Sequence, residues 1–167
     1  MLLKTPLLTG IFVCLILILG FNLSPHQAAD PNFKIISFEE FEKLKSKESN
    51  KLRVYNFWAT WCAPCVKEMP YFEAIGQNDA SVELVFISLD DGRKPGRVTT
   101  FLEKENIKSP VYLLNDVDYN QWIDKINPNW SGAIPATLFV QPSGENHFHE
   151  GELDESELEA LINKLKP

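Results

Sequence analysis

Cys62 and Cys65 lie in the segment Trp61-Cys-Ala-Pro-Cys, which directly follows the apolar run 54–58 and precedes a stretch with helical periodicity. A thiol in the first turn of a helix lies near unpaired backbone N–H groups and the positive end of the helix dipole, and both stabilise the thiolate. We therefore predict that Cys62 is the attacking sulfur. Cys65 follows three positions later, close enough to form a disulfide with Cys62 and to displace a partner from a mixed disulfide. The pair indicates thiol–disulfide exchange.

Metal binding is the main alternative for the same cysteine pair. A structural zinc site needs two further ligands, but the third cysteine, Cys14, lies in the apolar N-terminal segment. The histidines His26, His147 and His149 do not have the pair spacing of a zinc finger, and alternation of the last two along a predicted strand is more typical of a solvated strand face. We therefore assign no metal ligands. A pair of thiolates holding a soft ion such as copper(I) remains a competing hypothesis.

The first 29 residues are predicted to be an export signal and not part of the fold. Lys4 precedes an uncharged stretch, 5–23, that is rich in Leu and Ile, as in signal peptides. This stretch also approaches the ~20 apolar residues that span a bilayer, and cleavage after Ala28 or Ala29 would put a large residue where a small one is preferred. A cleaved signal peptide and a retained anchor both stay open, with the anchor slightly favoured. Either places the domain in the periplasm or otherwise outside the cytoplasm, and an anchor would hold it at the inner membrane.

The remainder of the 167-residue chain suits a single compact domain, which we place at 33–167. Residues 24–32 contain two prolines among small or polar neighbours and are predicted to form a tether. The formal net charge of −7 argues against nucleic acid or an anionic lipid surface as a partner. Cys62 and Cys65 are the cysteines left in this domain, so its stability must come from the core and not from structural disulfides.

Periodicity along the domain alternates between strands and helices. Ser37 and Glu40 form a capping-box pattern that starts a short helix with Phe38 and Phe41 on one face. Pro70 is expected to kink the helix that follows the cysteines or to end it. Strands are predicted at 52–57, 82–89, 111–114, 134–140 and 145–150, and helices at 62–76, 98–105, 116–126 and 154–166. This order predicts an α/β domain with a mixed sheet covered on both faces.

Two segments of this chain resemble a known family. They are Asn56-Phe-Trp-Ala-Thr-Trp-Cys-Ala-Pro-Cys-Val-Lys-Glu-Met-Pro70 and Ile134-Pro135-Ala136-Thr137, the latter before a predicted hairpin. Together they resemble the thioredoxin superfamily, in particular its exported TlpA/ResA-like branch, from about Phe33 to the end of the chain. The resemblance implies a thioredoxin fold, with three α/β/α layers around a mixed central sheet and an extra helix–strand insertion between 90 and 130.

The same resemblance assigns expected roles to residues around the cysteines. It implies that Pro135 is a cis-proline facing the disulfide and that the backbone of Ile134 contacts an extended substrate peptide. Classical thioredoxins carry a buried aspartate where this chain has Asn56, which cannot accept a proton. The branch often has a glutamate three residues after the second cysteine, and Glu68 occupies that place. We expect Glu68 to act with Cys62 and Cys65 in proton transfer if burial raises its pKa; the alternative is an ordinary exposed glutamate near a helix N-terminus.

Three tryptophans flank the expected site. Trp61 is predicted to shield the disulfide and to offer the substrate a flat apolar contact, with packing as the alternative. Trp58 lies at the end of a strand and is expected in the core. Trp130 precedes the Ile134–Pro135 loop and either lines the site or anchors that loop.

The resemblance implies an exported oxidoreductase that reduces disulfides of other proteins, with maturation of cytochrome c among the roles of the branch. The chain carries no nucleotide or flavin motif, so we expect no cofactor beyond the Cys62–Cys65 disulfide and a membrane thiol carrier as electron donor. We expect the domain to be a monomer. A disulfide oxidase or isomerase, in which electrons flow the other way, is the competing enzyme class.

Overall fold

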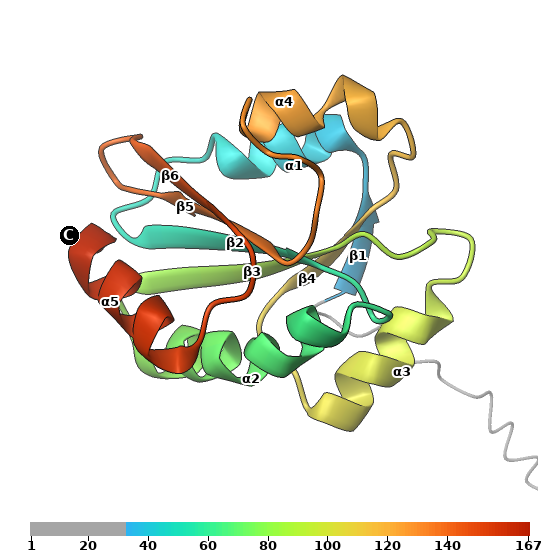
Figure 1. Ribbon diagram of the computed structural model, residues 1–167, viewed down its shortest axis with the longest axis horizontal. Helices are drawn as coiled ribbons and strands as arrows, with labels where there is room; N and C mark the ends of the chain where they lie inside the picture. The colour runs from blue at the N-terminus through green and yellow to red at the C-terminus, as the bar shows by residue number, and fades with distance from the viewer. Residues whose placement is uncertain (1–32) are drawn as a thin grey trace, which may run out of the picture.

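The computed structural model describes residues 33–167 (Figure 1). The predicted export signal, the tether, Cys14 and His26 lie outside the described residues. The elements are β1 (Phe33–Ile36), α1 (Phe38–Lys45), β2 (Leu52–Trp58), α2 (Ala63–Asn78), β3 (Val82–Ser88), α3 (Gly96–Glu105), β4 (Val111–Leu114), the 3-10 helix η1 (Tyr119–Gln121), α4 (Ile123–Ile126), β5 (Ala136–Val140), β6 (Asn146–Glu150) and α5 (Glu155–Leu165).

The strands form one mixed sheet in the order β1-β4-β3-β2-β5-β6. The pairs β1–β4, β4–β3 and β3–β2 are parallel, while β5 runs antiparallel to β2 and to β6. Because β2 and β3 are parallel and in register at Trp58 and Ser88, their carboxyl ends meet at one edge of the sheet. The cysteine motif follows β2 at that edge.

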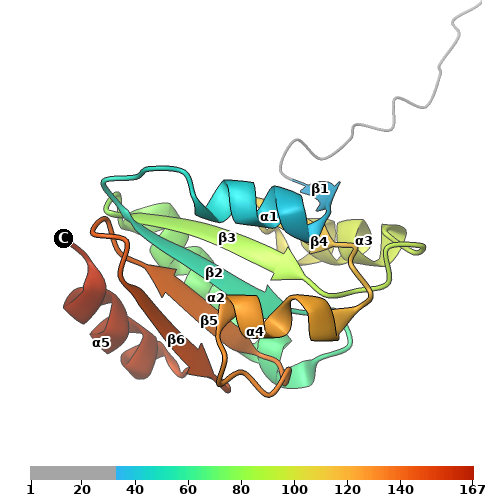
Figure 2. The same ribbon diagram turned by 90° about the horizontal axis from the view of Figure 1, so that it is seen from above.

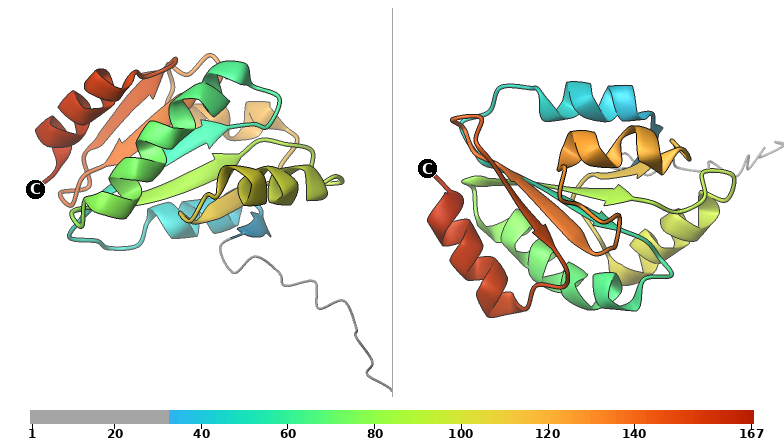
Figure 3. Two further views of the ribbon diagram at one scale, coloured as in Figure 1. Left: turned by 90° about the horizontal axis from the view of Figure 1, so that it is seen from below. Right: turned by 45° about the horizontal axis from the view of Figure 1, so that its top comes forward.

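Helices cover both faces of the sheet, as Figure 2 and the right view of Figure 3 show. Helices α1 and α4 lie on one face, and α2, α3 and α5 lie on the other. The pleat of β2 explains the division, because alternate side chains point to opposite faces. Val54 and Trp58 join the core under α2, α3 and α5, while Tyr55 and Phe57 join the core under α1 and α4. The predicted three-layer thioredoxin fold is confirmed.

Helix α1 forms as its sequence predicts. The Ser37 hydroxyl accepts the Glu40 N–H at 3.2 Å, and the Ser37 N–H donates to the Glu40 carboxylate at 3.0 Å. This capping box satisfies two backbone groups at the helix start. The helix buries Phe41, whose ring lies edge-on to Tyr55 and Phe57 on β2.

The insertion between 90 and 130 consists mainly of α3 and β4, and it places β4 between β1 and β3 in the sheet. Strand β1 was not predicted, because it has only four residues and its pairing partner β4 lies far along the chain. Within residues 33–167, no helix is both long and apolar enough to cross a bilayer.

One helix prediction was wrong. The segment 116–126 is not one helix but two short pieces, η1 and α4, separated at Trp122. The Trp122 side chain is buried, stacks on Phe38 with ring centroids 5.7 Å apart, and donates its indole N–H to the Asp116 carbonyl at 3.0 Å. Tertiary packing outweighs local periodicity in this segment. Helix α2 continues through Pro70 to Asn78, so the helix predicted after the cysteines is confirmed and the alternative of a boundary at Pro70 is wrong.

Candidate active site

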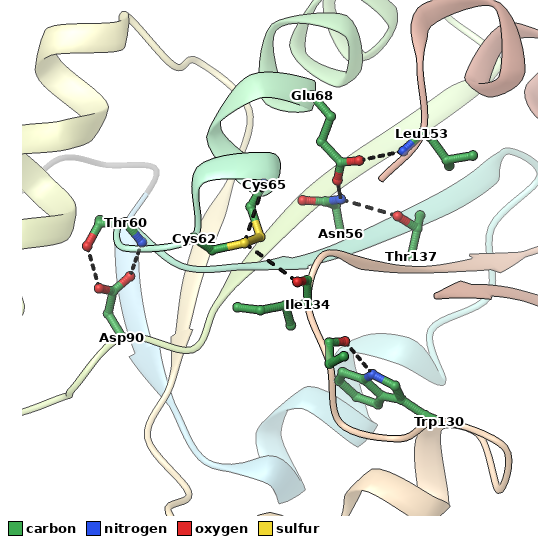
Figure 4. The surroundings of a disulfide bond; sticks show 11 residues. Asn56, Thr60, Cys62, Cys65, Glu68, Asp90, Trp130, Ile134, Thr137 and Leu153 are labelled. Atoms are coloured by element: carbon green, nitrogen blue, oxygen red, sulfur yellow. Dashed lines mark hydrogen bonds between the residues drawn. A yellow bond between two sulfur atoms is a disulfide. The ribbon is translucent and has the colours of Figure 1, made fainter. Parts of the chain in front are cut away.

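The site is built where β2 leads into α2. A turn closed by a hydrogen bond from the Cys62 N–H to the Ala59 carbonyl, at 3.1 Å, joins the two elements. Cys62 is the N-cap of α2, and its Sγ accepts the Cys65 N–H at 3.3 Å. The two cysteines form a disulfide with a Cα–Cα distance of 5.3 Å (Figure 4). One sulfur is therefore held at the positive end of a helix by a backbone donor.

The two cysteines differ in exposure. Cys62 retains 6% of its surface exposed, whereas Cys65 is fully buried against the core under α2. A disulfide sulfur or thiol of another molecule reaches Cys62 first. This asymmetry matches the predicted order of attack by Cys62 and resolution by Cys65.

The loop before β5 faces the disulfide. The Ile134–Pro135 peptide bond is cis, as the resemblance implies. The Ile134 carbonyl oxygen lies 3.7 Å from Cys62 Sγ, so the backbone of this loop borders the reactive sulfur. In Figure 4 the loop crosses directly beside the disulfide.

Glu68 is buried one turn along α2 from Cys65. Its side chain has no exposed surface, so the alternative of an ordinary exposed glutamate is wrong. Its carboxylate accepts the Leu153 N–H at 2.8 Å and the Asn56 side-chain N–H at 2.8 Å. Burial raises the pKa of Glu68 to about 7, although these two hydrogen bonds favour the charged form; the nearby charge of Glu152 adds to the rise. A carboxyl group with this pKa can exchange a proton near neutral pH.

Asn56 connects Glu68 to the strand that follows the cis-proline loop. Besides Glu68, its side-chain N–H group donates to the Thr137 hydroxyl at 3.2 Å, and residues 56 and 137 are cross-strand partners in the β2–β5 ladder. Its amide oxygen is buried without a hydrogen-bond partner among the described residues, and in Figure 4 it points toward the disulfide. Thr137 belongs to the Ile134–Thr137 motif, but no role was predicted for it. Its position two residues after Pro135 is the signal that could have suggested one.

An apolar hollow of about 430 Å³ opens beside the disulfide. Its walls include Trp61, Tyr119, Trp122, Ile123, Trp130 and Ile134. Trp61 is 67% exposed, as its predicted role requires. Trp130 combines both of its expected roles, since it lines the hollow and its indole N–H donates to the Ala133 carbonyl in the loop at 2.8 Å. Tyr119 and Trp122 were missed, because a continuous helix predicted at 116–126 gave no reason to place them at the site.

Trp58 lies in the core, as the sequence predicts. Trp58 is fully buried and packs on Phe101 of α3. His147 and His149 lie on β6, where the ring of His147 packs against Phe139.

Comparison with known proteins agrees with this geometry. The model of the AhpC/TSA family matches residues 26–145. The thiol-disulfide oxidoreductase ResA of Oceanobacillus iheyensis is 30% identical over 146 residues, covering 83% of this chain and 72% of the relative. ResA of Bacillus thuringiensis is 29% identical and covers 98% of this chain and 99% of the relative. A solved structure, a thioredoxin-related protein from Neisseria meningitidis serogroup B, is 27% identical with a TM-score of 0.61, covering 73% of this chain and 89% of the other. The predicted resemblance is thus confirmed, and the chain belongs to the AhpC/TSA family of the thioredoxin superfamily.

Proposed function

We propose that this chain is a thiol–disulfide oxidoreductase that reduces disulfides of other proteins through Cys62 and Cys65. The observation that carries the proposal is the asymmetric pair, in which Cys62 caps α2 and keeps a small exposed surface while Cys65 lies fully buried behind it. Relatives that cover nearly the whole chain are named thiol-disulfide oxidoreductases, which supports the same activity.

The reaction begins with the reduced pair. The Cys62 thiolate attacks one sulfur of the substrate disulfide, and the other substrate sulfur leaves as a thiolate that takes up a proton. The Cys65 thiol then loses its proton and attacks Cys62 Sγ, which releases the second substrate thiol and leaves the Cys62–Cys65 disulfide. Two electrons pass to the substrate, and the pair must be reduced again by a dithiol.

Glu68 is the group that we assign to the Cys65 proton. Residues 65 and 68 lie three positions apart on α2 and both face the core, and the pKa of Glu68 is raised to about 7 by burial. Its carboxylate can accept the proton when Cys65 attacks and return it when the pair is reduced. Asn56 holds the carboxylate in place from β2.

The substrate segment is proposed to lie between the cis-proline loop and the apolar hollow. Ile134 contributes both its carbonyl beside Cys62 Sγ and a wall of the hollow. A peptide extended along Ile134 and Pro135 can therefore place a neighbouring apolar side chain against Trp61 and Trp130. This arrangement fits a protein substrate with a bulky apolar residue near its cysteine.

The setting of the reaction is proposed from the sequence. Lys4 and the apolar stretch 5–23 support export to the periplasm or beyond the cytoplasm, with retention at the inner membrane if the segment is not cleaved. Electrons then come from a membrane thiol carrier, no bound cofactor is used, and the domain acts as a monomer. Similarity to proteins named ResA, together with the family resemblance, supports a role in cytochrome c maturation.

A trapping experiment tests the exchange. Full-length Cys65→Ser protein, mixed with an unfolded protein that carries a disulfide, should accumulate a mixed disulfide at Cys62, because the resolving thiol is missing. Cys62→Ser is the matched control and should capture nothing. If Cys65→Ser captures no protein while the wild type binds copper(I) stoichiometrically without disulfide turnover, the metal-binding hypothesis is correct instead.

A further inference from the structure

A buried carboxylate lies on the other side of the turn that carries Cys62. Asp90 follows the end of β3 and is 6% exposed. Its carboxylate accepts the Thr60 N–H at 2.9 Å, the Thr60 hydroxyl at 2.6 Å and the Ser88 hydroxyl at 2.9 Å. Figure 4 shows Asp90 and Thr60 joined by two of these bonds, beside the disulfide.

The position of this contact follows from the sheet. Trp58 and Ser88 are partners in the parallel β2–β3 ladder, so Thr60 and Asp90 stand two residues beyond the same point on neighbouring strands. The Leu89 N–H still donates to the Trp58 carbonyl at 2.8 Å. Beyond Leu89 the backbone ladder ends, and the side chain of Asp90 continues the link between the segments that follow β2 and β3.

Burial of a carboxylate is costly unless it is paired with a cation or hydrogen-bonded. Among residues 33–167, no lysine or arginine forms an ion pair with Asp90. Its donors are instead concentrated on Thr60, the second residue of the turn that the Cys62 N–H closes on Ala59. Both the backbone and the side chain of Thr60 are thereby fixed to β3.

We propose that Asp90 is a positioning residue for Cys62: by holding Thr60, it fixes the turn that presents Cys62 Sγ to the Cys65 N–H. That hydrogen bond, at 3.3 Å, stabilises the thiolate only while the turn keeps its orientation. The inference rests on the proposed exchange reaction and adds the residue that holds its attacking sulfur.

The direction in which the pKa of Cys62 changes distinguishes a positioning role of Asp90 from a direct effect of its charge. A nearby carboxylate by its charge alone disfavours a thiolate, so removal of only the charge lowers the pKa of Cys62. Loss of the turn's orientation weakens the Cys65 N–H contact and raises the pKa of Cys62. Asp90→Asn removes the charge but can keep the three contacts, since its oxygen accepts from the Thr60 N–H and the Ser88 hydroxyl and its amide N–H donates to the Thr60 hydroxyl oxygen.

The test measures how fast reduced, full-length protein reacts with a chromogenic aromatic disulfide as a function of pH. Asp90→Ala should raise the apparent pKa of Cys62 and slow the reaction at pH 7 by at least about threefold, the scale of a lost helix cap. Asp90→Asn, which keeps the contacts and removes only the charge, should leave the apparent pKa of Cys62 at or below the wild-type value and should react at pH 7 at least as fast as the wild type. Asp91→Asn is the control, because Asp91 is the adjacent carboxylate and pairs with Arg93 instead.

A second pair of variants, at Thr60, tests the inference even if Asp90→Ala fails to fold. Thr60→Val removes one donor to Asp90 and leaves the backbone bond, so it should shift the pKa in the same direction by less, whereas Thr60→Ser should match the wild type. A lowered Cys62 pKa in Asp90→Ala, or wild-type profiles in both Asp90→Ala and Thr60→Val, overturns the inference. Failure of the wild type itself to reduce the probe would instead count against the proposed function.

Discussion

Asn56 donates its side-chain N–H to the Glu68 carboxylate at 2.8 Å, and both side chains are fully buried. The two residues come from β2 and α2, the elements that flank the cysteine motif. An amide thus occupies the strand position at which classical thioredoxins carry a buried aspartate, and the titratable group lies on the helix. Because burial raises the pKa of Glu68 to about 7, the site keeps a proton acceptor suited to neutral pH.

Replacement of Glu68 by Gln should slow the step in which Cys65 resolves the mixed disulfide. Gln keeps the shape of the side chain but cannot take a proton, so the rate at pH 7 should fall by at least about tenfold. The increase of the wild-type rate as pH rises through about 7 should disappear. Single-turnover kinetics across pH 5–9 measure this. Glu159→Gln, on the exposed side of α5, serves as control, and an identical pH profile in Glu68→Gln would remove Glu68 from the mechanism.

The same carboxyl group should make stability depend on pH. Its pKa is about 7 when folded, against an ordinary value of 4.5, so the folded protein holds a proton that the unfolded chain releases between these values. The contribution of Glu68 to the free energy of unfolding should therefore be largest at about pH 5 and below. It should fall by roughly 2–3 kcal/mol as the pH rises from about 5 to 7. Carboxylates with lowered pKa values, such as Asp79 and Asp154, act in the opposite sense but at more acidic pH.

Urea unfolding at several pH values tests this linkage. Glu68→Gln should lose the decline between pH 5 and 7, because it has no proton to release there, and should equal or exceed the wild type in stability at pH 7. A wild type whose stability rises with pH across this window would show that Glu68 is ionised in the folded protein.

The apolar hollow should discriminate between substrates. Trp61→Ala and Tyr119→Ala remove wall area from the hollow and should raise KM for a disulfide peptide with a bulky apolar residue beside its cysteine by about tenfold. The same variants should reduce a small disulfide as fast as the wild type does. Ile35→Ala is a suitable control, since Ile35 is an exposed apolar residue on β1, outside the hollow. If both kinds of substrate were reduced equally more slowly, the substitutions would act on the disulfide itself and not on substrate binding in the hollow.

Local signals in the sequence predicted the parts of the site that depend on neighbours along the chain. The capping box of α1, the strand before the cysteines and the helix after them depend on spacing within a few residues, and all three are confirmed. The fold class followed from the order of elements and the resemblance.

Features set by contacts between distant segments could not be predicted. The break at Trp122 depends on the burial of that side chain against Phe38, and β1 depends on pairing with β4. The link between Asp90 and Thr60 depends on the register of β2 against β3. The burial of Glu68 depends on the segment before α5, whose Leu153 N–H donates to its carboxylate. The periodicity of a sequence gives no information on such contacts between segments that are far apart along the chain.

The reduction potential of the Cys62–Cys65 pair tests the central claim most directly. Full-length protein is equilibrated with thiol buffers of defined potential, and the fraction of disulfide is measured at each. A protein-disulfide reductase should have a potential near roughly −270 mV, at the thioredoxin end of the scale. A value near roughly −120 mV would mean that the pair donates disulfides and that electrons flow in the opposite direction.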